Sequence, residues 1–206
     1  MGLEWIGNML NLARVARRRL ALAWRGGRIG RRCSIAPGVR LECGRGRPIV
    51  LGDGVRLQRG VRLSTAAGGR IILEDHVYIG EYGTVLSAAE IRIARDTIIA
   101  PHARIVDFDR RLDAPLDPRA LAVQSAIRPG APGQSAIEAD PIRIGRDVWF
   151  GAGVTVRRGV QVGDQAVLGA GAVADRNIPD RGVAVGVPAR VVRFRGDSSE
   201  KGKSPA

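Results

Sequence analysis

A large apolar residue recurs every six positions along most of this 206-residue chain. The beat is clearest in the C-terminal third, at Ile144, Phe150, Val156, Val162 and Leu168. A period of two predicts a strand with one buried face, and a period of 3.6 predicts an amphipathic helix. A period of six, with three repeats in each turn, instead predicts a triangular coil that has one short strand on each face.

The same frame extends toward the N-terminus in triplets that start at residues 29, 51, 73 and 93. One turn therefore takes eighteen residues plus short insertions. A jelly roll of antiparallel strands would show alternation without this beat, so the pattern predicts an all-β parallel β-helix of hexapeptide repeats. The inward positions of the four triplets are Ile29, Ile35 and Leu41; Leu51, Leu57 and Leu63; Leu73, Ile79 and Val85; and Ile93, Ile99 and Ile105.

Residues 1–26 form a separate segment in which the six-residue beat is absent. Apolar residues recur there at roughly helical spacing, arginines lie among them, and Gly26-Gly27 follows. This pattern predicts a basic amphipathic helical segment. Such a helix could lie on an anionic membrane surface, or it could cap the coil or pack on a sister subunit.

The coil is expected to occupy residues 27–195, with one long interruption from Asp107 to Asp140. The interruption contains four prolines and many small residues, and within a coil it can only project outward. Residues 196–206 are short of apolar side chains, so we expect a disordered tail.

Charge and composition narrow the function. The net charge is +13, from 33 basic and 20 acidic residues, which favours an anionic partner such as a phosphorylated cofactor. Aromatic residues make up only 4% of the chain and the positive charges are scattered, so nucleic-acid binding is not expected. Cys33 and Cys43 are too few for a disulfide framework, and no apolar run approaches 18 residues. A cytoplasmic protein is therefore expected.

The segment from Pro141 to Gly153, PIRIGRDVWFGAG, resembles the hexapeptide-repeat acyltransferases, in the branch of sugar and xenobiotic O-acetyltransferases. The later segment GVPARVVR, from Gly186 to Arg193, resembles the end signature of that branch. The resemblance covers about Ile29 to Arg193. It implies a left-handed coil, a homotrimer, and acyl-coenzyme A bound between neighbouring subunits.

The resemblance also implies a cofactor site for acetyl-CoA. Ala152 and Ala170 match small positions beneath the cofactor's thin arm, and they stand eighteen residues apart, one turn above the other. Cations are needed for the phosphates, and arginine is suited to that role. The matching basic positions are Arg176, Arg190 and Arg193, and Asp175 belongs to the same predicted site.

The catalytic base is where the sequence departs from the family. The family's Asn-His pair falls on Asp109-Arg110, so an arginine stands where the base is expected. Arginine stays protonated in proteins and cannot act as a base. The alternatives are His102, at a corner close to the loop, and the carboxylates Asp107, Asp109 and Asp113. His76 and His102 also fit as plain polar corner residues.

Three accounts remain open: an acyltransferase with Asp109 or His102 as base, an acyltransferase acting on an amine, and a coil that binds coenzyme A without turnover. Two histidines are too few for a three-histidine zinc site, so no metal is expected. We expect an acetyl-CoA-dependent transferase acting on a hydroxyl or amine of a sugar or glycan intermediate. The acceptor could be lipid-linked, with the N-terminal helix at the inner membrane surface. The alternative is a catalytically silent structural trimer.

Overall fold

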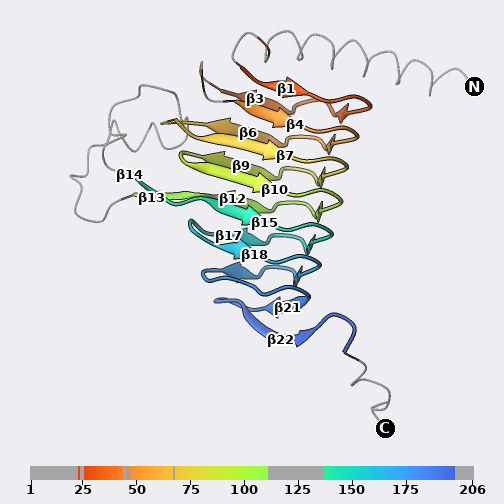
Figure 1. Ribbon diagram of the computed structural model, residues 1–206, viewed down its shortest axis with the longest axis vertical. Coiled ribbons are helices and arrows are strands. Elements are labelled where there is room, and N and C mark those ends of the chain that lie inside the picture. Colours follow the sequence, from red (N-terminus) through yellow and green to blue (C-terminus); the bar gives the residue numbers. More distant parts are fainter. Residues whose placement is uncertain are drawn as a thin grey trace, which may run out of the picture.

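Three parallel sheets wind around one axis and form a β-helix, as the repeat predicted, and the coil is left-handed, as the resemblance implied. The computed structural model describes residues 23, 26–43, 46, 48–66, 68–110 and 137–197, and of Arg110 only the backbone. Figure 1 shows the turns stacked along the long axis, with β1 near one end and β22 near the other. The predicted helical segment 1–26 and the tail 196–206 lie almost wholly outside the described residues.

Each sheet is one face of the triangular coil. Face A contains β1 (Arg28–Ile29), β4 (Ile49–Leu51), β7 (Arg70–Leu73), β10 (Glu90–Ile93), β15 (Ile142–Ile144) and β18 (Gln161–Val162). Face B contains β2 (Ser34–Ile35), β5 (Arg56–Leu57), β8 (Tyr78–Ile79), β11 (Ile98–Ile99), β16 (Trp149–Phe150), β19 (Val167–Leu168), β21 (Gly182–Val185) and the antiparallel β22 (Arg190–Phe194). Face C contains β3 (Arg40–Glu42), β6 (Arg62–Thr65), β9 (Thr84–Ser87), β12 (Arg104–Val106), β17 (Thr155–Val156) and β20 (Val173–Ala174).

The six-residue beat marks the interior of the coil. Ile29 pairs with Leu51, and Ile144 pairs with Val162, so equivalent apolar side chains stack on one another in successive turns. All of these stacked side chains belong to one hydrophobic core cluster. Phe150 is the largest fully buried side chain in it. Burial of these side chains supplies the main driving force for folding.

Two corners of the coil contain residues whose backbone φ is positive, in the left-handed region. Corner AB, between faces A and B, has Arg32, Gly54, His76, Asp96, Asp147, Gln165 and Arg181 at positive φ. Corner BC, between faces B and C, has Gly38, Gly60, Tyr82, His102, Gly153 and Gly171 at positive φ. Both histidines therefore occupy corners, as the sequence predicted.

The interruption of the coil begins and ends in a hairpin stem. β13 (Phe108–Arg110) and β14 (Ile137–Ala139) pair antiparallel and project from one side of the coil in Figure 1. The rest of the predicted loop, residues 111–136, lies outside the described residues. Among the residues described, no helix is long and apolar enough to cross a membrane.

Candidate functional site

Corner BC brings together the two small residues predicted for the cofactor arm. Ala152 and Ala170 are both exposed, and the amide of Gly171 donates to the carbonyl of Ala152 over 2.8 Å. The amide of Gly153 donates in turn to the carbonyl of Pro101 over 2.9 Å. Three successive turns thus place His102, Ala152 and Ala170 along the same corner, which the sequence alone did not show.

His102 is held on this corner by an aromatic neighbour. Its ring stacks on that of Tyr82, with 5.5 Å between the centroids and 11° between the planes. Tyr82 lies across Gly60, where an added Cβ would come within 2.4 Å of the tyrosine ring, so that position requires glycine. The amide of His102 also donates to the carbonyl of Glu81 over 2.9 Å. The imidazole is therefore exposed to solvent but restrained in orientation.

Asp109 lies at the other end of face C, because His102 precedes β12 and Asp109 follows it. Its carboxylate pairs with Arg157 at 2.9 Å and with Arg158 at 3.4 Å. Arg158 also pairs with Glu138 at 2.8 Å and with Asp140. Arginines from the turn after β17 therefore hold both strands of the hairpin stem, and Asp109 serves as part of that clamp.

Arg110 ends β13 opposite Ile137, at the last pair of the stem. The register fixes where its backbone leaves the coil, and its side chain is outside the described residues. Asp113, the remaining carboxylate considered as a base, also lies outside them.

Asp107 is buried and fully hydrogen-bonded. Its carboxylate accepts from the hydroxyl of Ser87 at 2.7 Å and from the amides of Ala88 at 2.7 Å and Ala89 at 3.1 Å. No part of the residue is exposed to solvent. Burial raises the pKa of Asp107, against the opposing effect of these hydrogen bonds. A carboxylate so enclosed fixes the turn after β9 and cannot reach a substrate.

The predicted phosphate-binding residues lie in the last turns of the coil, with Asp175 and Arg176 directly after β20 and Arg190 and Arg193 on β22. Asp175 pairs with Arg176 and with Arg190, each at 3.4 Å. Arg190 additionally donates to the carbonyl of Ala189 over 2.7 Å. Arg193 stands apart on β22 opposite Val183 and has no ion pair within the described ranges. The structure thus gathers three of the four residues into one charged cluster.

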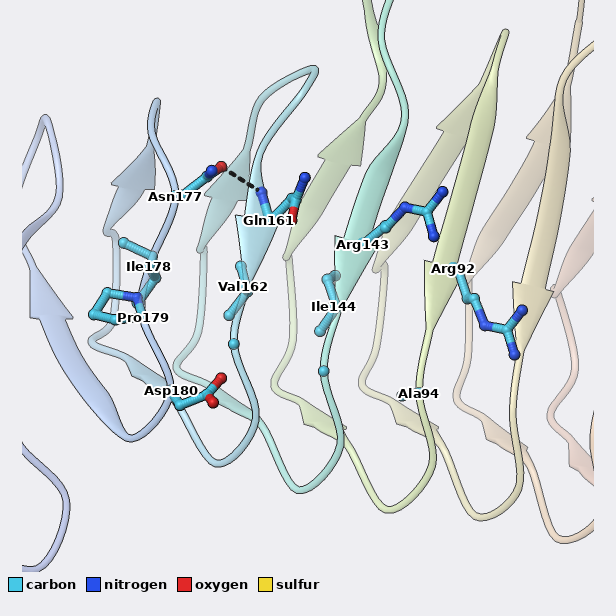
Figure 2. Close-up of a pocket in the computed structure, with 12 residues that line it drawn as sticks. Arg92, Ala94, Arg143, Ile144, Gln161, Val162, Asn177, Ile178, Pro179 and Asp180 are labelled. Atoms are coloured by element: carbon cyan, nitrogen blue, oxygen red, sulfur yellow. Dashed lines mark hydrogen bonds between the residues drawn. The ribbon is translucent and has the colours of Figure 1, made fainter.

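A shallow hollow on face A continues from this cluster through Asn177. It encloses about 490 Å³, and Figure 2 shows Arg92 and Arg143 reaching outward beside Gln161. The side-chain oxygen of Asn177 accepts from the amide of Gln161 over 2.8 Å. Arg92 is engaged with Glu74, so Arg143 is the cation in this hollow that lacks an acidic partner among the described residues.

His76, the second histidine, stands on corner AB, across face B from corner BC. Its Nδ1 lies 3.1 Å from a carboxylate oxygen of Asp96. Within the part of the chain that is described, no three His, Cys, Asp or Glu side chains gather into a group that could hold a metal ion.

The sequence analysis missed Tyr82 and the arginine pair Arg157–Arg158. Tyr82 could have been found by aligning the corner positions, because Gly60, Tyr82 and His102 follow one another at one-turn spacing. The ion pair of Asp109 with Arg157 has no comparable sequence signal, because the two residues are 48 positions apart and the loop between them has no repeat.

Comparison with known proteins agrees with this architecture. The family described as the hexapeptide repeat of succinyl-transferase matches residues 141–176. WbbJ of Escherichia coli, assigned to lipopolysaccharide biosynthesis as an O-acetyl transferase, is 33% identical over 134 residues, which is 65% of each chain. The galactoside O-acetyltransferase of Escherichia coli is 49% identical over 53 residues, or 26% of each chain. The chain therefore aligns with less than two thirds of the length of these curated relatives.

Solved structures share the fold across most of the chain. AntD from Bacillus cereus, an N-acyltransferase solved with dTDP and 3-hydroxybutyryl-CoA, has a TM-score of 0.68 at 16% identity, covering 87% of this chain and 88% of that one. The acetyltransferase VCA0836 from Vibrio cholerae, solved with acetyl-CoA, has a TM-score of 0.56 at 23% identity, covering 89% and 79%. The chain thus contains a hexapeptide-repeat segment at residues 141–176 and shares the β-helix fold of these acyltransferases.

The buried Asp107 predicts a pH-dependent stability. Because its pKa is raised in the folded protein, its stabilising contribution is full below the ordinary aspartate pKa of about 4 and is lost as the pH rises through the raised value. We expect the unfolding free energy of the wild type, minus that of Asp107→Asn, to fall as the pH rises above about 4.

Urea unfolding from about pH 2.5 to pH 8 measures the effect. Asp53→Asn is the control, because hydrogen bonds from the amide and side chain of Arg31 lower the pKa of Asp53. Its difference should be constant above about pH 4 and should fall as the pH drops below that value. Equal slopes for the two variants would contradict the assignment.

Proposed function

We propose that this protein transfers an acetyl group from acetyl-CoA to a hydroxyl or amine of a sugar acceptor. The observation that carries the proposal is the alignment of His102 with Ala152 and Ala170 on corner BC. Small exposed residues leave room for a thin pantetheine arm, and a proton acceptor stands one turn further along. The acetyltransferases among its relatives support the same chemistry.

The residues present fit the cofactor at two points. Along corner BC, Ala152 and Ala170 expose only backbone and methyl groups. At the C-terminal end, Arg176, Arg190 and Arg193 supply guanidinium groups suited to phosphates. Asp175 holds Arg176 and Arg190 in place, so we assign it a positioning role in the same site.

His102 is the base that the geometry supports best. Asp109 is clamped by two arginines, Asp107 is enclosed, and Arg110 cannot give up its proton. In the proposed step, an imidazole nitrogen of His102 takes the proton from the acceptor O–H or N–H. The acceptor atom forms a bond to the thioester carbonyl, the C–S bond breaks, and the thiolate leaves and is protonated.

We also propose that the C-terminal half of face B is covered by sister subunits in a homotrimer. Its outward residues there form an apolar stripe of Trp149, which is 57% exposed, and Val167 in the next turn. Face A instead presents arginines such as Arg92 and Arg143 outward. The part of corner BC beside this stripe would then face a neighbouring copy. Contact of residues 1–26 with the inner membrane surface remains a prediction from the sequence.

Acetyl-CoA binding tests the proposed function first. Calorimetry should show one site per chain, and the double variant Arg190→Ala/Arg193→Ala should raise the Kd at least tenfold through loss of phosphate contacts. Arg40→Ala, an exposed arginine on face C, is the matched control. Release of free coenzyme A with a panel of sugars and amino sugars then separates hydroxyl from amine acceptors. Binding without any release would favour the catalytically silent alternative.

Loss of the base should lower turnover while leaving the cofactor bound. His102→Asn keeps a residue that tolerates positive φ, and we expect kcat to fall by roughly 10²–10⁴ with the Kd for acetyl-CoA unchanged. Asp109→Asn should retain turnover within a few-fold, and Gln165→Asn on corner AB should match the wild type. Full activity of His102→Asn would remove His102 from the mechanism.

The proposed trimer can be tested at the centre of the apolar stripe. Trp149→Arg should convert the wild-type trimer into single chains, because an unpaired guanidinium would be buried in the interface. Light scattering after size-exclusion chromatography measures the mass, with Arg143→Glu on face A as control. A wild type that runs as a single chain at tens of micromolar would contradict the assembly.

A further inference from the structure

A second hollow lies at the junction of face B and corner AB, in the N-terminal half of the coil. It encloses about 620 Å³, within the range of small-molecule sites. Its lining residues come from four successive turns: Arg32, Gly54, Arg56, His76, Tyr78 and Ile98. Neither the predicted cofactor corner nor the cation cluster at the C-terminal end contributes to it.

The two arginines of this hollow differ from most of their neighbours. On the surrounding surface Arg31 pairs with Asp53, Arg70 with Glu90, Arg92 with Glu74, and Arg146 with Asp164. Arg32 and Arg56, in contrast, have no ion pair or side-chain hydrogen bond with any described residue. The hollow therefore holds two guanidinium groups whose charge is not neutralised locally, a setting that favours an anion.

The shape of the hollow depends on Gly54. A Cβ added there would lie 2.6 Å from Cδ2 of His76, so the imidazole closes over bare backbone. Nδ1 of His76 is taken up by Asp96, which leaves Nε2 directed to other partners. Tyr78 and the half-exposed Ile98 add an apolar and aromatic wall next to the cations. Such a combination suits an anionic group joined to a larger ring or chain.

Face B connects this hollow to the proposed catalytic corner. The chain passes from His76 on corner AB through β8 to Tyr82 on corner BC, the residue on which His102 stacks. Six residues at about 3.3 Å each span at most roughly 20 Å. An acceptor whose anionic group lies among the arginines would extend its sugar along face B toward this corner.

We propose that the hollow binds the phosphate or diphosphate group of the sugar acceptor. Arg32 and Arg56 contact the phosphate oxygens, and the imidazole of His76 forms one wall of the site. The assignment rests on the proposed acyl transfer for its biological meaning, while the anion binding itself does not depend on turnover. The diphosphate can belong to a nucleotide sugar or to a lipid-linked sugar, since both offer the same oxygens.

Calorimetry with inorganic pyrophosphate tests the site on the full chain. The titration is made at about 0.15 M ionic strength with the cofactor site saturated by coenzyme A, so that the C-terminal cations are occupied. We expect saturable binding, and a Kd at least tenfold weaker in both Arg32→Ala and Arg56→Ala. Arg40→Ala removes the same charge from the first turn of face C and should bind within twofold of the wild type.

Two results would overturn the proposal. One is wild-type affinity for pyrophosphate in both hollow variants, and the other is equal weakening in Arg40→Ala, which would mean only a general charge effect.

Parallel titrations with dTDP and with an isoprenyl diphosphate distinguish a nucleotide sugar from a lipid-linked sugar as the acceptor. The ligand that resembles the natural acceptor should bind more tightly than pyrophosphate, and Arg56→Ala should abolish that gain in affinity. Failure of acetyl-CoA binding would remove the proposed transfer and leave pyrophosphate binding intact, so the two failures are distinguishable.

Discussion

Stacking of equivalent side chains between successive turns is the interaction on which the whole molecule depends. A single turn cannot bury its apolar residues, and it gains a core only when the next turn places a matching residue above it. The parallel backbone hydrogen bonds hold that register. Because the inward positions are occupied by these stacked apolar side chains, functional side chains can lie only at corners, at outward strand positions and in the loop.

The corners show how this constraint creates a site. Positive φ turns the side chain outward and keeps it at a fixed height, so corner residues one turn apart form a straight row. On corner BC the row contains Tyr82, His102 and Gly153, with Ala152 and Ala170 beside the last turns. Residues far apart in sequence are thereby aligned without any loop to position them. A rigid row of this kind suits a long thin ligand.

The repeat allowed the fold to be predicted down to individual side chains, because a local six-residue beat determines which residues point inward. The burial of Phe150 and Ile144, for example, is predicted directly by this beat. The same beat placed His76 and His102 at corners. It could not place the carboxylates of the interruption, because their surroundings are set by partners outside the beat: Asp107 is enclosed by Ser87 and its neighbours, and Asp109 is clamped by Arg157. Tyr82 was predictable in position but not in its contact with His102.

The clamp gives a physical meaning to the departure from the family at Asp109-Arg110. An acidic residue at 109 has two arginines opposite it, so this position now stabilises the hairpin stem. A stem held by ion pairs on both strands fixes the backbone at Arg110, where a cation replaces a base. The proposed anion site lies instead on the coil itself, where Arg32 and Arg56 have no acidic partner among the described residues. Arginine thus has two uses in this molecule: ion-paired in the stem, where it stabilises the hairpin, and unpaired in the hollow, where we propose that it binds a ligand.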